Sequence, residues 1–146
     1  MKYQVTPFGA ALRALLLADP AIGVQVGERV HPHPLPAGSE LPAITYQRIG
    51  GGPVQEHSGL VDLGVAEVQL DVWASTDSGA EMLGVVVQYD VVETAPAFTQ
   101  GAIRFDSVAV LRDRGVSVDK ADVTEDAPVW RYSFDVSIAF TRLEAA

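Results

Sequence analysis

Two histidines alternate in the segment His31-Pro32-His33-Pro34, and this spacing can bring two imidazoles to one side of an extended chain. Neutral imidazole is a common metal ligand, so the pair could begin a metal site. A complete site needs a third and a fourth ligand, and only His57 and dispersed carboxylates remain. We therefore predict that residues 31–42 form an extended, proline-rich surface connector without regular structure, and that they hold no metal.

Two other segments contain residue types used in catalysis or phosphate binding. Glu56-His57-Ser58 has the residue types of a nucleophilic triad, but neighbours in sequence do not have triad geometry, and no G-x-S-x-G turn is present. Gly50-Gly51-Gly52 is followed by Pro53 and a polar segment, whereas a phosphate loop leads into a helix. We predict no catalytic site and no nucleotide site in either segment.

The acidic cluster Asp119, Asp122, Glu125 and Asp126 offers hard oxygen ligands for a divalent cation. Its spacing lacks the calcium-loop pattern and the glycine that this pattern requires. We predict a charged loop that faces solvent or another subunit. Neither this cluster nor the segments above predicts an enzyme, a cofactor or a bound metal.

Trp73 is the residue that favours an interaction surface. It shares one face of an alternating segment with Glu67, Gln69 and Asp71, while Val68, Leu70 and Val72 lie on the other face. A large aromatic side chain on a polar face is either an interface anchor or packed under a local helix or loop. The candidate interface residues are Trp73, Glu67, Gln69, Asp71 and, in the polar segment 50–64, Gln55, Glu56 and His57.

Composition limits the remaining functions. The 146 residues carry a formal net charge of −9, which disfavours unspecific nucleic-acid binding because phosphate contacts need clustered Lys and Arg. The absence of cysteine excludes disulfides and thiolate chemistry. No apolar run approaches the ~20 residues that span a bilayer. Arg13 interrupts the N-terminal apolar stretch, so we interpret it as a helix of the mature protein and expect synthesis in the cytoplasm.

The apolar periodicities predict two helices and four strands. Thr6 is the expected N-cap of the first helix, with Pro7 at its first position, and Asp19-Pro20 ends it. In chain order, we then expect a connecting segment 21–30, a strand 43–49, a mobile loop or hairpin tip 50–64 and a strand 65–74. A helix 79–92 follows, with cap candidates in Ser75-Thr76-Asp77-Ser78. The remaining elements are a strand 103–111, a turn or the start of a polar connection at 112–115, an acidic irregular segment 116–127 and a long strand 130–141.

Three of these strands follow loops rather than helices, a pattern typical of antiparallel sheets. We therefore predict one domain over residues 1–146, of the α+β class, with a mostly antiparallel β-sheet of about four strands packed by two α-helices on one face.

The order of these segments resembles the tail-terminator, or tail-completion, family of long-tailed phages, prophages and gene transfer agents. A Leu- and Ala-rich helix is followed by Gly27-Glu28-Arg29-Val30 and by the proline-containing strand Leu41-Pro42-Ala43-Ile44-Thr45-Tyr46. A strand like Val68–Ala74, a helix, and a closing strand like Trp130–Asp135 complete the pattern. The resemblance covers about residues 9 to 141. The valine-rich second helix and the acidic segment 116–127 depart from it.

The resemblance implies a structural protein of the virion tail, similar to the tail terminator of phage lambda. Such proteins form a ring, here expected to be hexameric, on the last ring of the tail tube. The ring ends tail polymerisation and presents a surface to the head-completion, or stopper, protein. The implied partners are further copies of the chain, the major tail tube protein and the stopper. DNA passes through the lumen without specific binding, and no membrane, cofactor or catalytic residue is implied.

Two alternatives remain open from the sequence. The first is a head–tail connector or another minor tail component of related fold, which would differ in its neighbours and not in its chemistry. The second is a cytoplasmic ligand-binding α+β module or small enzyme, which predicts a deep pocket with convergent polar groups. A nucleic-acid-binding regulator is disfavoured by the charge.

Overall fold

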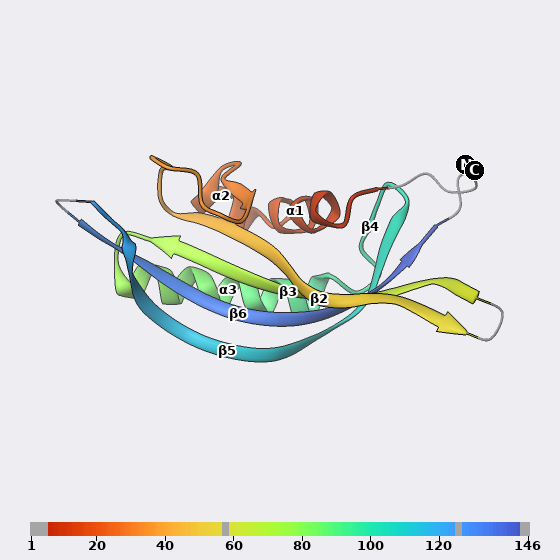
Figure 1. Cartoon of the computed structure of the whole chain (residues 1–146). Helices are drawn as coiled ribbons and strands as arrows, with labels where there is room; N and C mark the ends of the chain where they lie inside the picture. Colours follow the sequence, from red (N-terminus) through yellow and green to blue (C-terminus); the bar gives the residue numbers. More distant parts are fainter. Residues whose placement is uncertain (1–5, 57–58, 125–126, 144–146) are drawn as a thin grey trace.

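A computed structural model describes residues 6–56, 59–124 and 127–143, with the backbone alone for 54–56, 59–62, 119–124 and 127. The described elements are α1 (Phe8–Ala18), α2 (Pro20–Val26), β1 (Val30–Pro32), β2 (Ala43–Glu56), β3 (Gly59–Ala74), α3 (Asp77–Thr94), β4 (Thr99–Gln100), β5 (Ile103–Thr124) and β6 (Ala127–Arg142) (Figure 1). The α+β class is confirmed. The expected four strands and two helices are too few.

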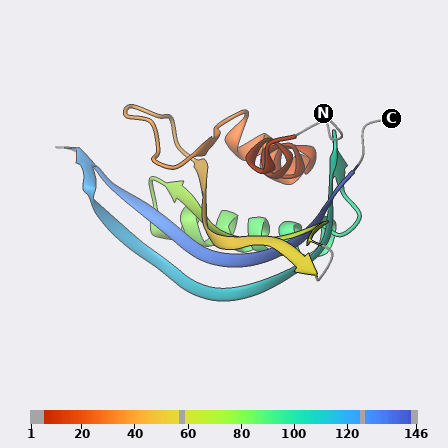
Figure 2. The same ribbon diagram turned by 45° about the vertical axis from the view of Figure 1, so that its right-hand side comes forward.

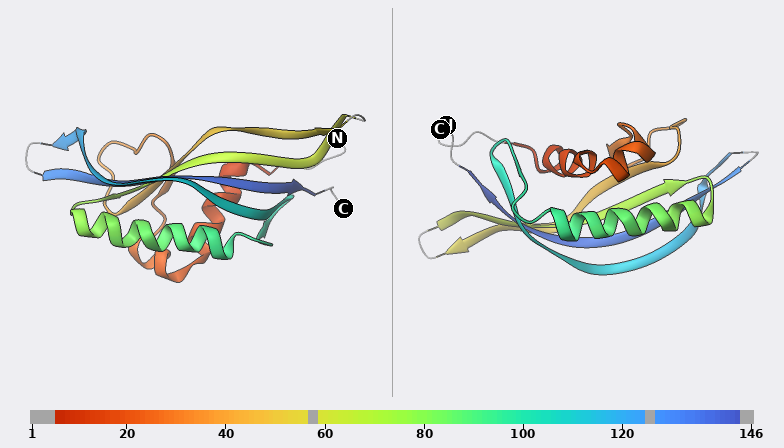
Figure 3. Two further views of the ribbon diagram at one scale, coloured as in Figure 1. Left: turned by 90° about the horizontal axis from the view of Figure 1, so that it is seen from below. Right: turned by 180° about the vertical axis from the view of Figure 1, so that it is seen from behind.

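One sheet holds the six described strands, in the order β1-β2-β3-β6-β5-β4. β1 pairs with β2 in parallel, and the other neighbours are antiparallel. The sheet curls into a trough, and the helices lie on its concave side (Figure 1, Figure 2). α3 runs along the strands beside β5 and β6 (Figure 3). None of the helices among the described residues lies on the convex side of the sheet.

The N-terminal region contains two helices where the sequence predicts one. α1 ends at Ala18, as Asp19-Pro20 predicts, but Pro20 then begins α2 because proline suits the first turn of a helix. Asp19 caps α2 by accepting a hydrogen bond from the Ala21 backbone N–H at 2.9 Å. The predicted N-cap role of Thr6 is wrong, since its hydroxyl accepts from the Ala102 N–H at 2.8 Å.

The proline-rich segment is more regular than predicted. Val30–Pro32 forms β1, and its register with β2 pairs Val30 with Ile44 and Pro32 with Tyr46. Proline is tolerated here because β1 is an edge strand, whose outer N–H groups need no ladder partner. His31 therefore lies in a strand, while His33 follows it and donates its backbone N–H to the Tyr46 carbonyl at 2.9 Å.

β2 and β3 form a hairpin much longer than the predicted strands 43–49 and 65–74. Gly50-Gly51-Gly52 does not end β2, which bulges between Arg48 and Gly50 and between Pro53 and Gln55 and continues to Glu56. Gly51 has φ +88°, and a Cβ there would lie 2.0 Å from the Val65 carbonyl oxygen. Glycine therefore serves the close approach of two strands rather than chain mobility.

β5 is likewise longer than predicted. The expected turn 112–115 and irregular segment 116–127 are wrong for the described backbone, because β5 runs to Thr124 and pairs with β6. Bulges interrupt its register, among them one between Val110 and Arg112 and one between Asp113 and Gly115. Each bulge adds a residue and breaks the period-two alternation that identifies a strand in a sequence. The predicted final strand 130–141 is confirmed within β6.

α3 confirms the predicted helix 79–92 and its cap. Thr76 accepts a hydrogen bond from the Gly79 N–H at 3.0 Å, in the segment expected to begin the helix.

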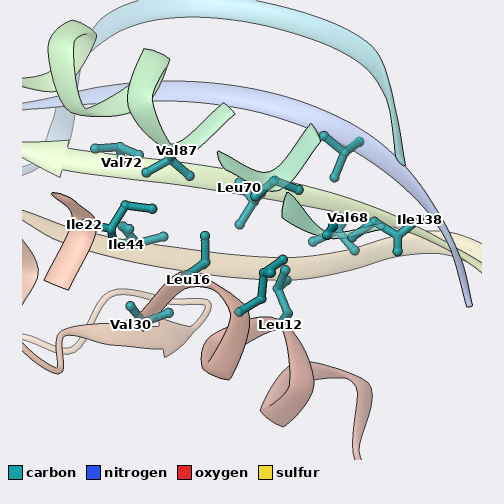
Figure 4. Close-up of a cluster of buried hydrophobic side chains, with 14 of the residues drawn as sticks. Leu12, Leu16, Ile22, Val30, Ile44, Val68, Leu70, Val72, Val87 and Ile138 are labelled. Atoms are coloured by element: carbon teal, nitrogen blue, oxygen red, sulfur yellow. The ribbon is translucent and has the colours of Figure 1, made fainter. Parts of the chain in front are cut away.

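A single apolar core fills the trough between the helices and the inner face of the sheet. Figure 4 shows Leu12 and Leu16 from α1, Ile22 from α2 and Val87 from α3 directed toward the strand residues Ile44, Val68, Leu70, Val72 and Ile138. These side chains are buried, which is the main stabilising term for such a domain. Among the described residues no single helix is long and apolar enough to cross a membrane, and α1 with α2 meets that test only as a pair bent by 98°.

Candidate interface surfaces

The convex face of the sheet holds the predicted interface residues of β3. Trp73 is only 2% exposed although no helix covers this face. Its indole N–H donates to Thr45 Oγ1 at 2.9 Å, and the Arg131 guanidinium lies 5.4 Å from its ring centroid. In the described chain, therefore, the indole packs against its own sheet between two neighbouring strands.

Gln69 and Asp71 lie beside Trp73 on the same face and contact each other, as the alternation predicts. The Gln69 side-chain N–H donates to both carboxylate oxygens of Asp71, at 3.2 and 3.1 Å. Glu67 is partly exposed further along β3. Gln55 and Glu56 belong to β2, but their side chains, and all of His57, lie outside the described residues. Whether this set meets a partner stays a prediction.

An ion pair continues this polar face on β5 and β6. The Arg114 guanidinium donates to both oxygens of Asp135, each at 2.6 Å, and also to Ser133 Oγ at 3.3 Å. The bidentate hydrogen bonds raise the pKa of Arg114, with the Asp135 and Asp71 charges adding to them. The face is thus a network of mutually satisfied polar groups. The sequence did not predict it, because Arg114 and Asp135 come together only through the bulged pairing of β5 with β6.

A second surface, which the sequence analysis missed, lies between α3 and β5. We call it the α3–β5 groove: a hollow of about 460 Å³ lined by Val85, Gln88, Tyr89, Val92, Val110, Asp113 and Tyr132. Met82 and Tyr89 on its helix are 72% and 64% exposed. Met82, Val85, Val86 and Tyr89 follow the i, i+3, i+4, i+7 spacing, so the sequence did contain the signal of a second apolar stripe.

Tyr132 forms the floor of the α3–β5 groove. Its hydroxyl donates to the Asp113 carboxylate and lies 3.2 Å from the Gln88 side-chain oxygen. Burial raises the pKa of Tyr132, and the hydrogen bond to Asp113 raises it further, so the hydroxyl keeps its proton. α3 approaches the ring closely because residue 84 is glycine, where a Cβ would lie 2.4 Å from Tyr132 Cγ. The groove is therefore apolar along its walls and carries one carboxylate, that of Asp113.

A pocket of about 310 Å³ separates the α1–α2 junction from the end of α3 and contains two carboxyl groups, Asp19 and Asp90. Asp90 is 6% exposed; Thr94 Oγ1 donates to its Oδ1 at 2.8 Å, whereas its buried Oδ2 has no partner among the described residues. Burial raises the pKa of Asp90 to about 7, and the neighbouring Asp19 adds to the shift. The other lining residues are the Thr94 hydroxyl and apolar side chains, so the feature that distinguishes this pocket is a buried carboxyl with a raised pKa.

No arrangement suited to metal binding is found in residues 6–56, 59–124 and 127–143, where no three His, Asp or Glu side chains come together. Asp119 and Asp122 of the predicted acidic cluster lie on the β5 backbone, and Glu125 and Asp126 fall outside the described residues. The two described surfaces offer contacts, a convex polar face and an apolar groove, rather than convergent reactive groups.

Comparisons with known proteins identify one protein family and one solved structure of similar fold. The family model described as tail completion protein gp17 matches residues 10–141. Among solved structures, a chain of the virion of a native gene transfer agent particle is similar in fold, with a TM-score of 0.64 and 17% sequence identity over 94% of this chain and 95% of that chain. No curated protein sequence matches. Because the family model covers most of the chain, the chain belongs to the tail completion protein gp17 family: it is a structural protein of the virion tail and not an enzyme.

Proposed function

We propose that the chain is a tail terminator, which forms a hexameric ring on the end of the tail tube, stops tube polymerisation and supplies the surface to which the head is joined. The observation that carries the proposal is the family match over residues 10–141. The similarity in fold to a chain of a gene transfer agent virion, over nearly the whole length of both chains, supports it.

The distribution of surfaces supports ring formation. A closed ring of identical subunits needs two different, complementary patches on each subunit. The chain offers the α3–β5 groove at one margin of its sheet and an incompletely paired β2 at the opposite margin. Met82 and Tyr89 are large, exposed side chains on one helix, and exposed apolar patches are typical of contact surfaces.

The proposed ring has a different partner on each of its two ends, the major tail tube protein and the stopper. The β2–β3 hairpin extends beyond the helices (Figure 1, Figure 3) and is the proposed tube contact, through Gln55, Glu56 and His57. The polar convex face with Glu67, Gln69 and Asp71 around the buried Trp73 is the proposed contact for a further partner in the particle. A formal charge of −9 per subunit supports a lumen through which DNA slides without being gripped.

The proposal is tested by tube growth. Major tail tube protein is allowed to polymerise in the presence of the purified chain, and tube lengths are measured by negative-stain electron microscopy. We expect elongation to stop and each stopped tube to carry density at one end. Tubes that grow to the same length with and without the chain would refute termination. Binding along the tube wall, or to heads alone, would favour another minor tail component instead.

A further inference from the structure

We propose that the α3–β5 groove of one subunit receives the open edge of β2, residues 47–53, from a second copy of the chain. This inference rests on the proposed ring and assigns its subunit contact. It follows from three properties of the described residues: where the sheet edges are open, which way those edges run, and which side chains they carry.

Both margins of the sheet are only partly covered. β1 pairs with Ile44, Thr45 and Tyr46 of β2 and stops there. At the opposite margin β4 pairs with Ile103 and Arg104 of β5. Beyond these pairs, within the described residues, the outer edges of β2 and β5 have no neighbouring strand. An unpaired strand edge presents free backbone N–H and C=O groups, which form a template for pairing with another chain.

The two open edges have complementary directions. β2 is antiparallel to β3, β3 to β6 and β6 to β5, so β2 and β5 run in opposite directions within one subunit. When two copies stand side by side in the same orientation, the β2 of one therefore lies antiparallel to the β5 of the other. Such a contact is head-to-tail and uses each margin once, and it gives a closed ring when the rotation between neighbouring copies adds up to a full turn.

Side chains rather than a long backbone ladder carry the contact. The bulges of β5 between Val110 and Arg112 and between Asp113 and Gly115 interrupt the spacing that a continuous ladder requires. The α3–β5 groove lies directly beside this edge, and Val85, Tyr89, Val92 and Val110 give it apolar walls. A segment laid against β5 would cover these walls.

The charges of the two margins are complementary. α3 contains no Lys or Arg, and its exposed charges are the carboxylates of Asp77, Glu81 and Glu93. The β2 edge presents an exposed arginine, Arg48, next to the exposed apolar side chain of Ile49. Arg48 donates to two carbonyl oxygens of its own hairpin, at 3.3 and 3.4 Å, and lies beside the rings of Phe8 and Phe140. These contacts hold the Arg48 side chain in place, and its exposed guanidinium can contact a neighbouring subunit.

The basic residues of β5 do not cancel this complementarity. Arg114 forms an ion pair with Asp135 on the convex face. Arg112 pairs with Asp135 in the β5–β6 register, so its side chain is directed to the same convex face and not into the groove. The groove, on the concave side, keeps Asp113 as its own charged group, and the Tyr132 hydroxyl donates to that carboxylate. Among the residues that line the groove, the charged group offered to a neighbour's Arg48 is therefore the Asp113 carboxylate.

Crosslinking tests the contact directly because the chain has no cysteine. A variant with both Ile49→Cys and Tyr89→Cys is bound to tail tubes and treated with a short bifunctional thiol reagent. We expect a ladder of crosslinked chains up to the full ring, and only dimers when the two single variants are mixed. The matched control carries Val24→Cys with Tyr89→Cys, since Val24 is 82% exposed on α2 and outside the proposed contact; it should stay uncrosslinked.

Two charge variants give an independent measurement. Tyr89→Glu and Arg48→Glu should each lower the fraction of capped tubes by at least about tenfold at equal protein concentration, while Val24→Glu leaves it unchanged. Both residues are exposed, and circular dichroism with thermal unfolding checks that each variant is folded at the temperature of the assay. Rings that form normally in both variants, with no crosslink between positions 49 and 89, would overturn this contact and leave the ring intact. A wild-type chain that forms no ring would overturn the proposed function, and this contact with it.

Discussion

Asp90 shows how one carboxyl group can make the stability of the chain depend on pH. It lies at the end of α3, 6% exposed, with Oδ2 unpartnered among the described residues. Burial disfavours its charged form, and the nearby Asp19 carboxyl acts in the same direction, so its pKa rises from 3.8 to about 7. The Thr94 hydroxyl opposes this shift only in part. At neutral pH the group is therefore close to half protonated.

The sign of the effect follows from linkage. Because the pKa of Asp90 is higher in the folded than in the unfolded chain, folding favours its protonated form. The contribution of Asp90 to the free energy of unfolding is therefore greatest below pH 4 and is lost as the pH rises through 7. Asp90→Asn removes the buried charge. We expect it to raise the free energy of unfolding at pH 8.5 by at most about 4 kcal/mol and to change it little near pH 4.

Urea denaturation at several pH values measures this effect. The control is Glu93→Gln on the same helix, where the side chain is exposed and the change should stay within about 0.5 kcal/mol at each pH. An Asp90→Asn effect of equal size at pH 4 and pH 8.5 would contradict the account of the buried carboxyl.

Gly84 tests the packing of α3 on the floor of the α3–β5 groove. Alanine is the better helix former by about 1 kcal/mol, but its Cβ would lie 2.4 Å from Tyr132 Cγ. Since the ring is held by the Asp113 hydrogen bond, we expect Gly84→Ala to destabilise the fold by about 1–3 kcal/mol.

The matched variant is Gly23→Ala in α2, where the nearest atom to the new Cβ is the Leu17 carbonyl oxygen at 3.8 Å. That substitution should leave stability unchanged or raise it by up to about 1 kcal/mol. Thermal unfolding of the two variants compares them, and a stabilised Gly84→Ala would show that α3 can move away from Tyr132.

At the scale of elements, the tip of the β2–β3 hairpin is expected to contribute little to stability and much to tail capping. β3 begins to pair with β6 only at Leu63, so the described residues of this segment, 52–56 and 59–62, pair with no third strand. Replacing residues 52–62 with a short turn should therefore change the free energy of unfolding by no more than about 1 kcal/mol. Because this tip is the proposed tube contact, we expect the shortened chain to lose tube capping.

Circular dichroism and thermal unfolding check the fold of the shortened chain, and tube length checks its capping. Normal capping would show that the hairpin tip is not the tube contact. A shortened chain that fails to fold would show instead that the hairpin contributes to the core, against the pairing described above.

The elements that the sequence predicts are those with uninterrupted periodicity. The strict alternation from Trp130 to Thr141 and the capped helix near Thr76 are both found in the structure. β5 is longer than predicted because each of its bulges shifts the alternation by one residue. β2 is longer because Gly50–Gly52 resembles a strand end, whereas Gly51 lets two strands approach. α2 was missed because a proline that ends one helix can also begin the next.

The candidate site could be predicted only where it is local in sequence. Gln69, Asp71 and Trp73 share a face because alternate residues of one strand must do so. The Arg114–Asp135 ion pair and the α3–β5 groove depend on how separate elements pack, which no spacing along the chain reveals. Trp73 is buried rather than exposed because Thr45 and Arg131 from the two flanking strands enclose it.

At the scale of the whole molecule, the fold is shared with a chain of a gene transfer agent virion at only 17% sequence identity. A curled sheet around an apolar core depends on the apolar pattern more than on particular residues, so it persists while surfaces diverge. Two open margins on opposite sides of one sheet, with opposite directions and complementary charge, are the features that suit this molecule to a closed ring.

We propose that a defined number of copies assembles at the end of a tail tube. Light scattering of the purified chain alone, followed by quantitative co-sedimentation with assembled tubes, measures this number. We expect a monomer or a hexamer that co-sediments at one ring of six copies per tube end. A chain that stays monomeric and does not bind tubes at any concentration would refute the proposed ring.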